Sequence, residues 1–121
     1  MIKGAPVSRM VSVIMRAAVE QGASDIHVEP YEDELAVRYR IDGILCDAKV
    51  PSGIKRFGDA INSRIKIMSN LNIIERRIPQ DGRATVRIQD QMLDLRISSV
   101  PTPYAESLVI RLLPTTMLFD L

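Results

Sequence analysis

The stretch Ala84–Ser98, which reads ATVRIQDQMLDLRIS, decides the fold predicted for this chain. Apolar and polar residues alternate on both sides of Gln89–Gln91, a pattern typical of two half-buried strands joined by a turn. Successive side chains of a strand point to opposite faces, so one face of this hairpin is aliphatic and the other carries Arg87 and Arg96. An antiparallel sheet with one buried face is the expected result.

Two helices and four further strands are predicted around this hairpin. Apolar residues recur at helical spacing in Pro6–Gln21 and again from Ser52, a candidate N-cap, to near Asn70 or Asn72. The other predicted strands are Asp25–Pro30, Leu35–Ile41, Ile44–Val50 and Ser107–Leu113. The order of helix, three strands, helix and three strands predicts an α+β domain, with a mostly antiparallel sheet of about six strands and two main helices on one face.

Two Asp-Gly pairs are interpreted as hairpin turns. Asp42-Gly43 follows a clear strand, and Asp81-Gly82 follows Pro79, which no helix can include in its interior. Gly43 and Gly82 are therefore both expected to have positive backbone dihedrals.

Length and composition favour one soluble globular domain that spans residues 1–121, of which 46% are apolar and 26% charged. Aromatic residues make up only 4%, with no Trp, so the core must be aliphatic and base-stacking nucleic-acid modules are disfavoured. The sequence has no apolar run long enough to span a membrane and no signal-peptide pattern, so a cytoplasmic protein is expected. The single cysteine, Cys46, excludes an internal disulfide.

Basic residues are concentrated in one part of the chain. Eight basic and three acidic residues lie between Ile54 and Arg87, although the net charge of the whole chain is only +1. Within this part, Arg76, Arg77 and Arg83 surround a Pro-Gln-Asp-Gly corner. Arginine binds phosphate oxygens with two parallel hydrogen bonds, so an anionic partner is one interpretation and a solvated charged loop is the other.

Arginines also recur on the predicted polar face of the sheet. They are Arg38, Arg40, Arg87, Arg96 and Arg111. This face is either neutralised in place, for which Asp42, Asp94 and Glu106 are the candidates, or it forms an interface.

Sequence motifs for catalysis are missing from this chain. No Gly-x-x-x-x-Gly-Lys-Ser/Thr phosphate loop occurs, and one histidine (His27) with one cysteine (Cys46) makes neither a metal site nor a nucleophile and base pair. No catalytic residue, metal or cofactor is therefore expected in this chain alone.

Six motifs in order nevertheless resemble a known family. They are Ala23–Pro30, Arg38–Gly43, Arg64–Leu71, Glu75–Arg83, Asp94–Ser98 and Glu106–Leu113. Together they resemble the N-terminal half of the core of the type II secretion and type IV pilus assembly ATPases (GspE/PilB-like). One departure is Ala105, which stands before Glu106 where the family usually has glycine.

The resemblance implies a PAS-like domain (N2-type) of a cytoplasmic hexameric motor, located at the inner membrane through its partners. In the family this domain precedes a RecA-like domain that binds ATP and Mg²⁺, which would be absent from residues 1–121. The implied partners are that RecA-like domain, neighbouring subunits and the inner-membrane secretion platform, with no nucleic acid and no direct membrane insertion. The implied function is to close over the nucleotide and to transmit ATP-driven rotation to pilin or pseudopilin assembly.

The resemblance also indicates which arginines contact the phosphates in the full protein. Arg83 and Arg96 match the family motifs best, Arg77 is a third candidate and Arg111 a fourth. Each would neutralise charge on the β- and γ-phosphates, as arginine fingers do. The alternative for each is an ion pair that holds the sheet or a subunit interface. The alternative for the whole chain is a stand-alone PAS-like module that binds an anionic ligand or an acidic partner.

Overall fold

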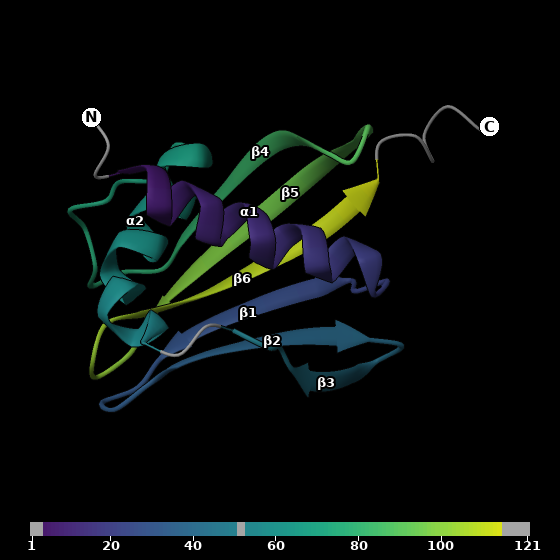
Figure 1. Ribbon diagram of the computed structural model, residues 1–121. Helices are drawn as coiled ribbons and strands as arrows, with labels where there is room; N and C mark the ends of the chain where they lie inside the picture. Colours follow the sequence, from purple (N-terminus) through teal and green to yellow (C-terminus); the bar gives the residue numbers. More distant parts are fainter. Residues whose placement is uncertain (1–3, 51–52, 115–121) are drawn as a thin grey trace.

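The computed structural model describes residues 4–50 and 53–114 (Figure 1). In chain order the elements are α1 (Gly4–Glu20), β1 (Asp25–Pro30), β2 (Leu35–Ile41), β3 (Ile44–Asp47), the short 3₁₀ helix η1 (Ile54–Phe57), α2 (Gly58–Met68), β4 (Gln80–Ile88), β5 (Gln91–Pro101) and β6 (Glu106–Pro114). The predicted order of helices and strands is confirmed. The predicted N-cap Ser52 lies outside the described residues.

The six strands form one antiparallel sheet in the order β3-β2-β1-β6-β5-β4. The pairing of β1 with β6 joins the N-terminal strands to the C-terminal strands, because all other neighbouring strands are consecutive in sequence. Both helices lie against one face of the sheet, as Figure 1 shows, and the other face is open. The predicted α+β fold is therefore confirmed.

The core lies between the helices and the covered face of the sheet. Its most buried side chains are aliphatic, including Ile26, Leu95 and Ile110, each at most 1% exposed. Tyr39 is buried too, and its hydroxyl donates a hydrogen bond to the carbonyl oxygen of Ile14 at 2.7 Å, which ties β2 to α1. Burial raises the pKa of the Tyr39 phenol because the charged form would lose its hydration.

The prediction of a turn at Asp81-Gly82 is wrong. Gly82 lies inside β4 opposite Ile97, and its φ is not in the left-handed region. A Cβ at Gly82 would lie only 2.5 Å from the carbonyl oxygen of Ser69 and 2.7 Å from Cδ2 of Leu71. Glycine is needed here because the chain that leaves α2 crosses the strand at very short distance. The other prediction is confirmed, since Gly43 has a φ of 82°.

Positive φ values also mark the real turns. Gln89 and Asp90 have φ of 52° and 63°, as expected for a two-residue hairpin between β4 and β5. Asn70, with φ of 61°, follows the end of α2. Ala105 is not among the residues with positive φ, so alanine in place of the glycine that the family resemblance predicts causes no strain of this kind.

The strand predicted for Ile44–Val50 is shorter than expected. β3 ends at Asp47, and all four of its residues are exposed at the edge of the sheet. Beyond it, Ala48 and Val50 pack against the core. Both side chains are partly buried, and the Ala48 backbone N–H still donates to the carbonyl oxygen of Val37 at 2.8 Å.

Candidate functional site

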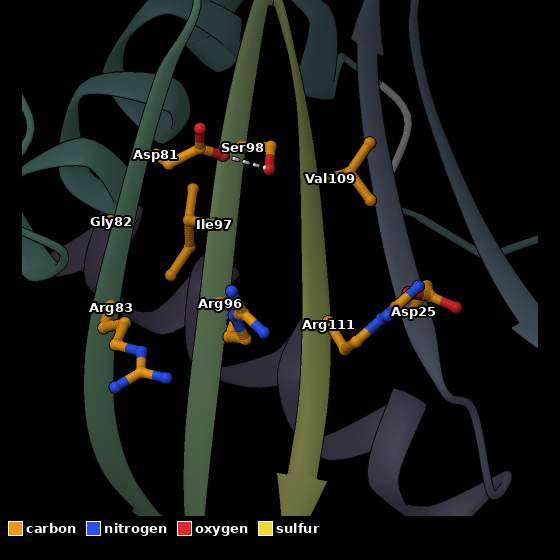
Figure 2. A pocket seen from close by; sticks show the side chains of 9 residues that line it. All are labelled: Asp25, Asp81, Gly82, Arg83, Arg96, Ile97, Ser98, Val109 and Arg111. Carbon is orange, nitrogen blue, oxygen red and sulfur yellow. Dashed lines mark hydrogen bonds and ion pairs between the residues drawn. The ribbon is translucent and has the colours of Figure 1, made fainter.

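A row of arginines crosses the open face of the sheet. In the strand register Arg83 on β4 lies opposite Arg96 on β5, and Arg96 lies opposite Arg111 on β6. Figure 2 shows these three side chains on three adjacent strands, and we call them the arginine row. Directly opposite residues have Cβ atoms about 4.5–5.5 Å apart, so the three arginine side chains start from neighbouring points on the sheet.

The arginine row borders a shallow hollow of about 440 Å³. The row contributes all three of its arginines to the lining (Figure 2). The other lining residues are Asp25, Asp81, Gly82, Ile97, Ser98 and Val109. The hydroxyl of Ser98 donates a hydrogen bond to Asp81 at 2.7 Å, so this carboxylate has a partner of its own. The hollow is therefore positively charged where β4 and β5 carry the row.

Among the residues that the structure describes, a carboxylate neutralises only one end of the row. The Arg111 Nε lies 3.2 Å from Asp25 Oδ1, and the Arg40 Nε lies 3.9 Å from Asp25 Oδ2. Arg83 and Arg96 have no ion pair and no side-chain hydrogen bond with any residue that the structure describes. Like charges directly opposite each other destabilise a sheet. Arg83 and Arg96 therefore lower the stability of the domain unless an anion binds between them.

The carboxylates predicted to neutralise the arginines of the open face do not form ion pairs with them in the described residues. Asp94 accepts a hydrogen bond from the Thr85 hydroxyl at 3.1 Å, and Glu106 is buried away from the arginine row. Asp42 forms no ion pair among the described residues. The carboxylates that pair with open-face arginines are instead Asp25, Glu29 and Asp47.

Arg38 is the most completely neutralised of these arginines. It lies 3.2 Å from Asp47 and 2.9 Å from Glu29, and these contacts, with Asp47 first, raise the pKa of its guanidinium. Arg38 therefore holds the sheet together rather than offering a free charge.

Arg77 is separate from the arginine row. It lies in the loop between α2 and β4, its side chain is 89% exposed, and it does not line the hollow. The Arg77 backbone N–H donates to Glu75 Oε2 at 2.9 Å, and this hydrogen bond is the main reason that the pKa of Glu75 is lowered. The structure thus brings together Arg83, Arg96 and Arg111 but not Arg77. The predicted corner around Pro-Gln-Asp-Gly does not form, because β4 already begins at Gln80.

A buried ion pair that the sequence analysis missed supports the loop before β4. Lys66 is 1% exposed, and its Nζ donates to both carboxylate oxygens of Glu106, at 2.8 and 2.9 Å, and to the carbonyl oxygen of Glu75 at 3.0 Å. The spacing in sequence could have indicated this pair. Asn62 and Lys66 lie four residues apart, and each directly follows an apolar residue of the helix stripe. This places them at the border of the buried face.

The chemistry of the arginine row fits phosphate oxygens and not a metal ion. In residues 4–50 and 53–114 no three His, Cys, Asp or Glu side chains come together in a way that could hold a metal. Mg²⁺ needs carboxylates and other oxygen ligands, which the row does not offer. In the same part of the chain, no helix combines the length and the apolar character needed to cross a membrane.

Comparison with known proteins gives consistent matches. A family model described as "Type II/IV secretion system protein" matches residues 2–121. The chain is 53% identical over 117 residues to type II secretion system protein E of Xanthomonas campestris pv. campestris, covering 96% of this chain and 20% of that protein. It is 48% identical over 110 residues to type II secretion system protein HxcR of Pseudomonas aeruginosa (91% and 23%), and 39% identical over 109 residues to type II secretion system ATPase E of Vibrio cholerae serotype O1 (90% and 21%). The chain therefore spans about a fifth of the length of these relatives.

Proposed function

As this chain belongs to the Type II/IV secretion system protein family, we propose that it is the N-terminal core domain of a type II secretion ATPase and that Arg83 and Arg96 of its arginine row contact the phosphates of ATP. Membership confirms the family predicted from the six motifs. The nucleotide and Mg²⁺ would be bound mainly by a RecA-like domain of the same protein. A relative carries the name ATPase, while the present sequence has no phosphate loop.

The observation that carries this proposal is the free pair formed by Arg83 and Arg96. The two residues lie opposite each other on adjacent strands, and neither has an anionic partner in the described residues. A phosphoryl group between them would remove their mutual repulsion and accept charge-assisted hydrogen bonds from both. The pair would then stabilise the charge that develops on the β- and γ-phosphates during hydrolysis.

The other two candidate arginines receive different roles. Arg111 flanks the phosphate site but is engaged by Asp25. Arg77 belongs to an exposed loop and is assigned to contacts with a RecA-like domain or a neighbouring subunit of the hexamer. In this proposal the domain closes over the nucleotide, and its movement on hydrolysis is transmitted to the inner-membrane platform and to pseudopilin or pilin assembly.

A stand-alone anion-binding module is the second candidate function. The supporting observation is the 440 Å³ hollow, whose three arginines all come from this chain. Such a module would bind its ligand tightly without any other domain, whereas half of an ATP site should bind free nucleotide only with a Kd of about 1 mM or weaker.

The test combines one binding measurement and one activity measurement. The 121-residue chain is titrated with the Mg²⁺ complex of a non-hydrolysable ATP analogue and followed by NMR of backbone amides and arginine Nε–H groups. Shifts at Arg83 and Arg96 that weaken with added salt are expected. In the full-length protein, Arg83→Ala and Arg96→Ala should each lower kcat for ATP hydrolysis by roughly 10³-fold or more, the range known for arginine fingers.

Arg87→Ala is the matched control, because Arg87 lies on the same strand and the same open face but outside the row, opposite Met92. It should leave kcat within about twofold of the wild type, as expected for an exposed surface position. Equal effects of Arg83→Ala, Arg96→Ala and Arg87→Ala on kcat would refute the proposed contact with phosphate. Tight binding of nucleotide by the chain alone would favour the stand-alone module.

A further inference from the structure

Asp25 is a buried carboxylate at the end of the arginine row. It is 5% exposed, and it accepts a hydrogen bond from the Ser24 hydroxyl at 2.8 Å in addition to its contacts with Arg111 and Arg40. Building on the proposed function, we propose that Asp25 is a specificity-determining residue. It confines the bound anion to Arg83 and Arg96 by keeping Arg111 engaged.

The order of charges along the row gives the first argument. From β4 to β2, the residues that face each other are Arg83, Arg96, Arg111, Asp25 and Arg40. At the β4 end of this series, Arg83 and Arg96 have no ion-pair partner among the described residues. At the β2 end, the Asp25 carboxylate lies between the guanidiniums of Arg111 and Arg40. Positive charge available to a ligand is therefore concentrated on β4 and β5.

Arg111 lies much closer to Asp25 than Arg83 does. Neighbouring strands lie about 4.8 Å apart, so an anion at Arg111 would be roughly 5 Å from Asp25 and an anion at Arg83 roughly 14 Å away. The Debye length at physiological salt is about 8 Å. Repulsion from the Asp25 carboxylate therefore acts on an anion at Arg111 and is largely screened at Arg83.

The two partners of the Asp25–Arg111 ion pair differ in exposure. The Asp25 side chain is 8% exposed, whereas the side chain of Arg111 is 64% exposed. The carboxylate is enclosed, whereas the guanidinium is exposed and already lines the hollow, so it can bind a ligand there once it is released. Replacement of Asp25 by asparagine would remove the ion pair and give Arg111 to the ligand, so that the site would consist of three arginines instead of two.

The inference specifies the class of ligand. Two neighbouring guanidiniums fit one terminal phosphoryl group, while three guanidiniums across three strands span about 10 Å and fit a longer polyphosphate. The wild-type chain is therefore expected to discriminate little between orthophosphate and tripolyphosphate. For Asp25→Asn, the ratio of the affinity for tripolyphosphate to the affinity for orthophosphate is expected to be roughly tenfold higher than in the wild type. This is the gain expected for one added charge-assisted contact at an exposed site.

Glu29→Gln is the matched control. It removes one negative charge from the same strand and the same open face, but Glu29 pairs with Arg38 and not with the row. It changes the net charge as Asp25→Asn does, so any general electrostatic gain in affinity appears in both variants. In Glu29→Gln, the ratio of the affinity for tripolyphosphate to the affinity for orthophosphate should stay at the wild-type value.

The experiment titrates wild type, Asp25→Asn and Glu29→Gln with orthophosphate, pyrophosphate and tripolyphosphate, and follows the arginine Nε–H signals by NMR. Support would be ligand-induced shifts of Arg83 and Arg96 without Arg111 in the wild type, and of all three in Asp25→Asn. A shift of Arg111 in the wild type equal to those of Arg83 and Arg96 would overturn the inference, even if Asp25→Asn did not fold. Equal affinity ratios in the two variants would overturn it as well. Absence of any phosphate binding in all three proteins at millimolar ligand would overturn this inference, whereas the proposed function is tested separately by the effects of Arg83→Ala and Arg96→Ala on kcat.

Discussion

Lys66→Met is expected to lower the free energy of unfolding by about 3–5 kcal/mol, because it leaves a buried carboxylate without its counter-ion. All three N–H donors of Lys66 are used, two by Glu106 and one by the carbonyl oxygen of Glu75. The side chains of Lys66 and Glu106 are only 2% and 4% exposed, so water cannot replace the lost partner. The substitution also releases the loop before β4.

This loss is large for a domain of this size. A chain of 121 residues is expected to have a total stability of about 6–18 kcal/mol. The double variant Lys66→Met with Glu106→Leu should recover most of the loss, since apolar replacement of a whole buried ion pair is often neutral or stabilising. The hydrogen bond from Asn62 is retained in the double variant because it is accepted by the backbone oxygen of residue 106.

Urea unfolding followed by far-UV circular dichroism measures these differences by linear extrapolation. Lys49→Met is the control, because Lys49 is exposed, and its effect should stay within about 0.5 kcal/mol. The reasoning is refuted if Lys66→Met costs less than about 1 kcal/mol, well under the range for a broken buried pair, or if the double variant is no more stable than the single one.

Three further outcomes are expected from single substitutions, each measured by urea unfolding. Gly82→Ala should destabilise by about 1–3 kcal/mol, because the added Cβ would lie 2.5 Å from the Ser69 carbonyl oxygen. Tyr39→Phe should remove a loss of stability in alkali: burial raises the pKa of the Tyr39 phenol in the folded state, so its contribution is complete below pH 10.0 and is lost as the pH rises towards the raised pKa. Glu75→Gln should reduce the loss of stability in acid. Hydrogen bonds from Arg77 lower the pKa of Glu75, so its contribution is present above its ordinary pKa of 4.5 and disappears as the pH falls through the folded-state value.

Each of these predictions has a matched control. Gly58→Ala adds a methyl group at an ordinary 3.5 Å from Leu35 Cδ1 and at a φ of −56°, so a Gly82→Ala variant that costs no more would contradict the close contact with the segment after α2. Tyr104→Phe removes the hydroxyl of an exposed tyrosine, and an equal change in the alkaline loss would contradict the assignment to Tyr39. Glu34→Gln removes an exposed carboxylate, and an acid profile identical to that of Glu75→Gln would exclude a special role for Glu75.

The arginine row shows how far sequence reasoning reached into the site. The period-two alternation placed Arg96 and Arg111 on the open face, because the face of a residue in a strand depends only on its neighbours in sequence. The family motif indicates Arg83 as a phosphate contact and its Asp-Gly pair predicts a turn, whereas Arg83 lies inside β4. The closeness of Arg77 and Arg83 in sequence predicts one cluster, but the start of β4 separates them.

The order of helices and strands, the aliphatic core and the family can be predicted from the sequence alone, since each depends on local pattern and composition or on motifs in a fixed order. Which residues meet across the sheet depends on three-dimensional packing. Asp25 and Arg111 are 86 residues apart, and Lys66 and Glu106 are 40 apart. Their contacts depend on the pairing of β1 with β6 and on the packing of α2 against the sheet. Local propensity contains no information on such packing, and for this reason the need for glycine at position 82 and the division of the arginine row by Asp25 became visible only in three dimensions.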